Sequence, residues 1–99
     1  MNEQKIKEFE DLWLGDICDY YSCRDWCKEQ NEELFLAAEQ ECKKAFKYNY
    51  TEIIESDDPD YEEYDSYDRY NAIRFTLDFW WEYYGYELDY EYGLTKKGA

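Results

Sequence analysis

Apolar side chains in the first part of the chain recur at helical spacing. They lie three or four positions apart, at Ile6, Phe9, Trp13 and Ile17. Residues at that spacing share one face of a helix, so the pattern predicts a helix with a single apolar side. Gly15 lies near the end of the pattern and is expected to end or bend this helix.

A second helical stretch is predicted to run from Ser22 toward Tyr48. Ser22 and Asp25 have the spacing of a capping box, with Asp in place of the usual Glu, and mark its expected start. Its apolar face comprises Leu34, Ala38, Cys42 and Ala45. The charged residues that lie largely outside this face are Glu39, Lys43 and Lys47. Asn31 leaves open whether one helix or two occupy the stretch.

A loop is predicted where residues 55–60 read ESDDPD, because Ser, Asp and Pro all favour turns. The helix before this loop is expected to end near Ile54. The loop opens a strongly acidic stretch, in which seven of the twelve residues from Asp57 to Asp68 are Asp or Glu.

The C-terminal third fits two patterns. A helical stripe contains Tyr70, Ile73, Leu77, Trp81 and Tyr84. Ser66 is placed to cap the start of that helix, and Gly85 is placed to end it. Residues 73–79 also alternate as a strand does, so a hairpin over residues 72–92 is the alternative, although length and both end signals favour the helix. Beyond Gly85, residues 86–92 alternate Tyr or Leu with acids, which predicts a short extended segment.

These patterns predict a mainly α fold, a small single-domain helical bundle, and leave open an α+β arrangement with a short C-terminal strand or hairpin. Chain length agrees, because 99 residues make one domain. Leu, Ile, Val and Phe make up only 17% of the chain, which is typical of disorder. Aromatic residues, at 22%, nevertheless predict a folded domain with an aromatic core.

Charge divides the chain into three parts. Residues 1–49 carry a net charge of −5 and form the expected helical scaffold. Residues 50–92 carry −12 together with ten of the 13 tyrosines, and residues 93–99 are expected to be a flexible tail. The total of −15 repels phosphates and anionic lipid, so direct binding to nucleic acid or to a membrane is not expected.

The residue types also exclude several kinds of chemistry. The chain has no histidine and no glycine-rich phosphate loop, so we expect neither an enzyme nor a cofactor. The charged N-terminus lacks the apolar segment of a signal peptide, and no apolar run is long enough to span a bilayer. We therefore expect a cytoplasmic protein.

No metal site is expected, although zinc binding by the cysteines stays open as an alternative. The four cysteines lack the spacing of a zinc site and are interpreted as buried free thiols, Cys18, Cys23, Cys27 and Cys42. The acidic stretch does not form a calcium loop of the EF-hand type, because Glu62 and Asp68 stand where Gly and Glu are required.

The acidic stretch instead indicates a surface that binds a basic protein. Tyrosines recur at every third position through it and are separated by acids. Tyrosine combines contact area with a polar end, and carboxylates beside it suit clefts rich in Arg and Lys. The C-terminal extended segment has the same character. The predicted partner-binding residues are Asp57, Asp58, Asp60, Tyr61, Glu62, Glu63, Tyr64, Asp65, Tyr67, Asp68, Glu87, Asp89 and Glu91.

In size, acidity and aromatic content the whole chain resembles phage-encoded DNA-mimic inhibitors, the anti-CRISPR and antirestriction proteins. The resemblance implies a nonenzymatic inhibitor in the host cytosol that occupies the basic DNA- or RNA-binding cleft of a CRISPR effector or nuclease. Residues 83–89, YYGYELD, are similar over seven positions to a stretch of the barstar family of acidic ribonuclease inhibitors. That likeness implies that Tyr83, Gly85 and Asp89 contact a partner.

Two other functions stay open: an immunity protein or antitoxin for one cognate nuclease, and an acidic structural or adaptor protein. We expect a monomer or a weak dimer. Exposed aromatic residues such as Trp80 or Trp81 would provide a self-contact, whereas repulsion between the acidic chains opposes it.

Overall fold

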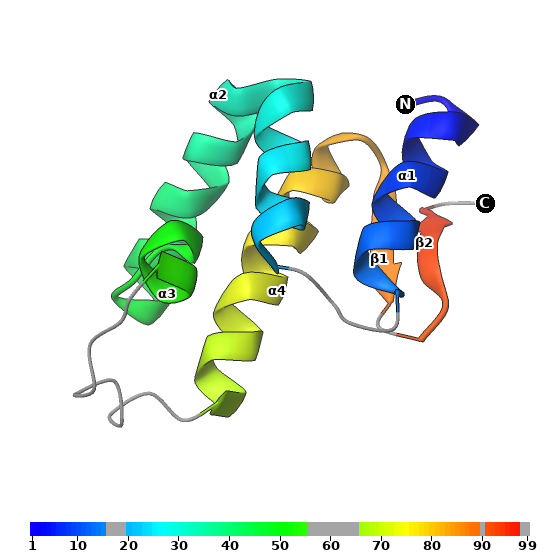
Figure 1. The fold of residues 1–99 in the computed structure, drawn as a ribbon. Coiled ribbons are helices and arrows are strands. Elements are labelled where there is room, and N and C mark those ends of the chain that lie inside the picture. Colours follow the sequence, from blue (N-terminus) through cyan, green and yellow to red (C-terminus); the bar gives the residue numbers. More distant parts are fainter. Residues whose placement is uncertain (16–19, 56–65, 90, 98–99) are drawn as a thin grey trace.

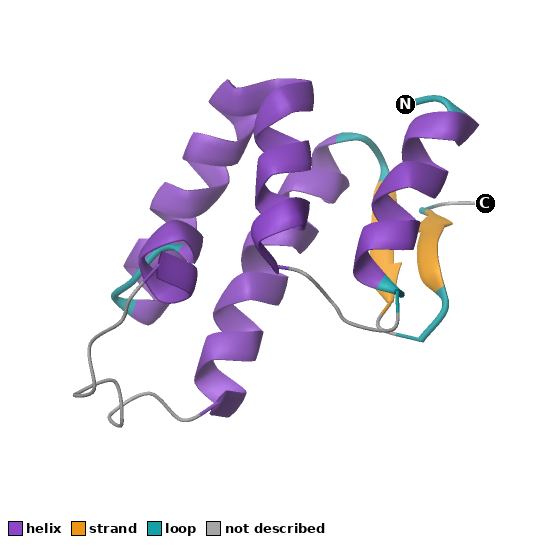
Figure 2. Cartoon of the chain, in the orientation of Figure 1, coloured by secondary structure: helices purple, strands orange, loops and turns teal. Residues whose placement is uncertain are grey.

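Four helices are followed by a two-stranded hairpin in the computed structural model, which describes residues 1–15, 20–55, 66–89 and 91–97 (Figures 1 and 2). The elements are α1 (Glu3–Trp13), α2 (Tyr20–Phe46), α3 (Tyr50–Glu55), α4 (Ser66–Tyr83), β1 (Tyr86–Asp89) and β2 (Gly93–Lys96). The predicted mainly α fold with a short C-terminal hairpin is confirmed. α4 contacts α2, α3 and β1, so it joins the α2–α3 side of the molecule to the hairpin and α1 (Figure 1).

α1 confirms the first predicted helix. The Asn2 side chain accepts a hydrogen bond from Lys5 N at 2.9 Å and caps the helix start. Phe9 and Trp13 are buried on the predicted face. The helix ends at Trp13 with Leu14 as its C-cap, next to Gly15 as expected, while Ile17 lies outside the described residues.

α2 contains a kink at Asn31, where φ is −160° and ψ is 86°. The Asn31 side chain accepts a hydrogen bond from Leu34 N at 3.1 Å, so it caps the helical segment that follows. Its amide donates to the Tyr84 hydroxyl at 3.0 Å. The stretch therefore consists of two helical segments. The predicted start at Ser22 is wrong, because the helix already begins at Tyr20.

The apolar face predicted for α2 is partly wrong. Ala38 and Cys42 are buried as expected, but Ala45 is exposed and Glu39 is buried. Glu39 is buried because α3 packs against α2, and its Oε2 accepts a hydrogen bond from Thr51 N at 2.8 Å in the first turn of α3. The carboxylate thus satisfies a backbone donor that the short helix leaves without an internal partner.

The centre of the molecule is a cluster of large aromatic side chains, which we call the tryptophan core. It comprises Phe9, Trp13, Trp26, Trp80 and Trp81, and each is at most 8% exposed. The Trp81 ring lies 5.1 Å from Phe9 and 5.6 Å from Trp26 between centroids. The expectation that Trp80 or Trp81 is exposed for a self-contact is therefore wrong, because both are fully buried between α4, α2 and α1.

α3 and α4 match the remaining helix predictions closely. α3 ends at Glu55, one residue beyond the predicted Ile54. α4 is a continuous helix, so a hairpin over residues 72–92 is wrong, and Ser66 is its first helical residue. Gly85 follows the helix at a φ of +83°, the left-handed conformation expected of a glycine at that place.

The hairpin pairs β1 and β2 antiparallel, with Leu88 opposite Leu94. Residues 93–96 therefore form a strand, and the prediction of a flexible tail over them is wrong. Two side chains from other elements hold the hairpin. Arg74 Nη2 donates to Leu88 O at 2.6 Å, and Glu10 Oε2 accepts from Leu94 N at 3.0 Å. These hydrogen bonds attach the backbone of β1 to α4 and the backbone of β2 to α1.

Candidate functional site

Most of the predicted partner-binding residues belong to the segment between α3 and α4. Those outside the described residues are Asp57, Asp58, Asp60, Tyr61, Glu62, Glu63, Tyr64 and Asp65. Tyr67 and Asp68 belong to the first turn of α4, and their side chains also lie outside the described part of the structure. The described residues on either side of this segment show how its two ends are held.

The end of α3 is bound to α2. Arg24 Nη1 donates to Glu55 Oε1 at 2.8 Å, and its Nε donates to Asp25 Oδ1 at 3.0 Å. Burial alone would lower the pKa of Arg24, but these hydrogen bonds and the two carboxylate charges outweigh it and raise that pKa. The Tyr21 hydroxyl donates to Ile54 O from the same turn of α2.

The start of α4 is bound to the same place. Arg69 Nη2 donates to Ile53 O at 3.2 Å, so a residue of the first turns of α4 satisfies a carbonyl of α3. The described residues that flank the acidic segment, at the end of α3 and in the first turns of α4, are thereby bound to neighbouring helices. The segment itself carries six acids and no base over residues 56–65.

The hairpin brings part of the second predicted strip to the surface. Glu87 and Glu91 are exposed, and Tyr92 between the strands is 78% exposed. Asp89 has a structural role, because its Oδ1 accepts hydrogen bonds from Glu91 N at 2.7 Å and Tyr92 N at 3.1 Å. The strip therefore offers two exposed carboxylates, whereas the third holds the turn.

Two further carboxylates, which local sequence patterns do not reveal, lie on α4 beside Glu87. Asp78 is half-buried, and burial raises its pKa to about 6. The charges of Glu87 and Glu82 add to this shift, while Arg74 and Lys97 oppose it. We call Asp78, Glu82 and Glu87 the acid edge. The spacing of Asp78 and Glu82 shows that they share one side of a helix, but their approach to Glu87 depends on β1 folding back along α4.

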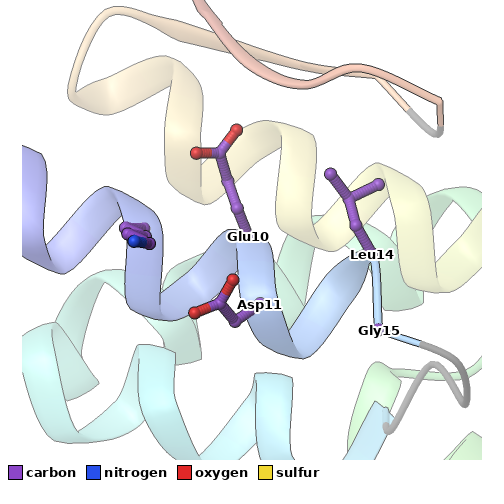
Figure 3. A pocket seen from close by; sticks show the side chains of 5 residues that line it. Glu10, Asp11, Leu14 and Gly15 are labelled. Carbon is purple, nitrogen blue, oxygen red and sulfur yellow. The ribbon is translucent and has the colours of Figure 1, made fainter.

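A hollow at the end of α1 is lined by Lys7, Glu10, Asp11, Leu14 and Gly15. Figure 3 shows the Glu10 and Asp11 carboxylates on successive positions of the helix, with Leu14 and Gly15 one turn further along. The Glu10 carboxylate at this hollow already accepts a hydrogen bond from Leu94 N. Its role is therefore to attach β2 to α1.

The described cysteines are structural. Cys23, Cys27 and Cys42 are buried free thiols, and burial raises the pKa of Cys27 and of Cys42. Cys42 Sγ donates to Ala72 O at 3.3 Å and so joins α2 to α4. Cys18 lies outside the described residues. Among the described side chains, no three His, Cys, Asp or Glu residues are arranged so that they could hold a metal ion together.

Comparisons of the chain with protein-family models, with curated protein sequences and with solved structures give no match. Over the described ranges, no helix combines the length and the apolar character needed to cross a bilayer.

Proposed function

We propose that this chain is a nonenzymatic inhibitor that mimics nucleic acid and occupies the basic DNA- or RNA-binding cleft of a CRISPR effector or nuclease. It acts in the host cytosol, as a monomer or weak dimer. The phosphate surrogates are the carboxylates of residues 57–68, and Tyr61, Tyr64 and Tyr67 supply contact area. Glu87 and Glu91 of the hairpin form a second strip of contacts.

One observation carries this proposal: the acidic half of the chain uses its few bases to hold the fold. Residues 50–92 contain 14 acids and two bases, Arg69 and Arg74. Arg69 donates to Ile53 O, and Arg74 donates to Leu88 O. Clustered negative charge opposes folding through self-repulsion, so its retention favours a role in binding a basic partner.

The attachment of the acidic segment also supports mimicry. A phosphate surrogate binds better when the scaffold that carries it is already fixed, because ordering a scaffold on binding costs free energy. Arg24, Tyr21 and Arg69 fix the two helix ends that carry the segment. Charge steering by such a cluster raises the association rate with a basic cleft.

The test has two steps. The tagged protein is first used to capture partners from host lysate, with and without added duplex DNA. Mimicry requires a nuclease or CRISPR effector that duplex DNA displaces. A nuclease held equally well in the presence of DNA would contradict mimicry and support the immunity-protein alternative.

The captured enzyme is then titrated in a fluorescence-anisotropy competition with labelled duplex. Asp58→Lys with Glu62→Lys should weaken displacement of DNA by about tenfold or more, because charge reversal opposes steering and removes surrogate phosphates. Asp11→Lys with Glu29→Lys changes the net charge equally at exposed positions outside the proposed site. Equal losses in the two double variants would overturn the site assignment.

A further inference from the structure

A second hollow lies where the kink of α2 meets the C-terminal end of α4. It is lined by Asn31, Glu33, Leu34, Ala37 and Tyr83, and we call it the kink hollow. Asn31 fixes the two helices there, because its amide donates to the Tyr84 hydroxyl and its backbone O accepts from Trp80 Nε1 at 3.4 Å. The kink hollow is thus built on the tryptophan core and contains none of the residues of the acidic segment or of the hairpin strip.

Most of the Tyr83 side chain at the kink hollow lies outside the core, with its ring edge-to-face to Tyr84 at 5.1 Å between centroids. Tyr83 is 69% exposed, although Trp80 and Trp81 of the same helix are fully buried. A tyrosine this exposed contributes little to the burial of apolar surface that stabilises the fold, and its ring is accessible to a partner.

Negative charge borders this apolar surface. Glu32 and Glu33 are exposed in the first turn after the kink, where the helix N-terminus favours carboxylates. Within the described part of the chain, neither forms an ion pair. Glu82, next to Tyr83, binds Lys97 Nζ at 3.3 Å. The Glu33 carboxylate is therefore available to a ligand at the rim of the hollow.

We propose that the kink hollow receives an arginine side chain of the basic partner. The guanidinium plane stacks on the Tyr83 ring and pairs with the Glu33 carboxylate, while its aliphatic stem lies along Leu34 and Ala37. Arginine suits this place better than lysine, because its planar group stacks on an aromatic face and binds a carboxylate through two donors. A second copy of this chain is a poor occupant, since both copies carry a charge of −15.

This inference rests on the proposed function for the basic character of the partner and adds a second point of contact. α4 has 18 residues and a length of about 27 Å. The acidic segment joins its first residue, and Tyr83 is its last residue. The partner is therefore engaged at both ends of α4, by carboxylates at one end and by a tyrosine with a carboxylate at the other.

The test uses the full chain and two peptides, acetyl-(Gly-Arg)4-amide and acetyl-(Gly-Lys)4-amide, at low salt. Titration by two-dimensional 1H–15N NMR should shift the amides of Leu34, Ala37 and Tyr83. The arginine peptide should produce these shifts at about one third of the concentration that the lysine peptide requires, or less. Shifts confined to the hairpin or to residues 57–68 would overturn the proposal.

Two matched variants separate stacking from general charge attraction. Tyr83→Ala should weaken the binding of the arginine peptide about fivefold, because it removes the stacking surface. Tyr92→Ala removes a tyrosine of similar exposure from the hairpin turn and should change binding less than about twofold. Equal effects would contradict the proposal, and circular dichroism checks that both variants fold. Neither DNA nor a nuclease is present, so failure here is distinct from failure of the DNA competition.

Discussion

α4 has two sides that differ sharply in what they contribute. One side enters the tryptophan core, where Trp81 packs against Phe9 and Trp26 and is fully buried. The other side forms the acid edge, where Asp78 lies near Glu82 and Glu87. Burial of aromatic surface stabilises the fold on the first side, whereas like charges oppose it on the second.

The difference shows which residues the fold needs. Removing apolar surface from water is the main favourable contribution to folding, and the core supplies most of it with few aliphatic residues. The acid edge keeps three carboxylates together, although Arg74 and Lys97 offset them only in part. The acid edge therefore works against stability, and changing each side of α4 separately tests this difference.

The largest effect is expected from the core. Trp81→Ala should lower the free energy of unfolding by about 3–5 kcal/mol, because it removes a fully buried indole and leaves a cavity. For a small domain this approaches the whole stability. Urea unfolding followed by circular dichroism measures it. Tyr83→Ala, two positions along α4, should change stability by less than about 0.5 kcal/mol; equal losses would mean that the aromatic cluster does not hold the fold.

A smaller effect is expected where the hairpin attaches to α1. Gly93 has a φ of +83°, and a Cβ there would overlap the Glu10 carboxylate that holds Leu94 N. Gly93→Ala should therefore cost about 2–3 kcal/mol, from backbone strain together with the displaced carboxylate. Gly85 has the same φ, but no atom lies within 4 Å of the place that a Cβ would take, so Gly85→Ala should cost about 1 kcal/mol.

Thermal unfolding of these two glycine variants checks the difference. Their matched backbone conformations isolate the contribution of the Glu10 contact. If both variants lose the same stability, strain alone explains the loss, and the Glu10 carboxylate does not anchor the hairpin.

Local patterns predicted much of this fold. The apolar stripe of α1, the end of α3 and the glycine that ends α4 depend on neighbouring residues, so the sequence shows them, whereas the start of α3 as a separate helix at Tyr50 was not predicted. Three features depend on distant contacts. Glu39 is buried because α3 packs against α2 and Thr51 N donates to its carboxylate. The kink of α2 brings Asn31 O to Trp80 Nε1 on α4.

The strand β2 is the third feature of this kind. Its anchor, Glu10, lies 84 positions away from Leu94, and no local pattern of residues 93–99 indicates that contact. The exposure of Glu87 follows from alternation along β1, but the alternation predicted over residues 86–92 does not hold beyond that strand, because Glu91 and Tyr92 lie in the turn and both are exposed. The acid edge does not follow from any local pattern, because it requires α4 and β1 to lie side by side.

The smallest effect is expected at the acid edge and depends on pH. The folded state raises the pKa of Asp78 to about 6 from an ordinary value of 3.8. Between these values the unfolded chain has lost the proton and the folded chain keeps it, so Asp78 makes stability fall as pH rises. The Asp78→Asn variant cannot ionise at this position, so it should be more stable than the parent chain at pH 7. The expected gain in the free energy of unfolding is about 1 kcal/mol, because the side chain is 47% exposed and solvent screens its charge.

Urea unfolding at pH 4 and pH 7 measures this difference. The advantage of Asp78→Asn should be nearly absent at pH 4 and complete above pH 6, because the cost arises only when the folded carboxylate ionises. Glu29→Gln removes the same charge at an exposed position of α2 and controls for net charge. An equal gain from Glu29→Gln, or a gain that does not change with pH, would show that general repulsion rather than the acid edge opposes folding.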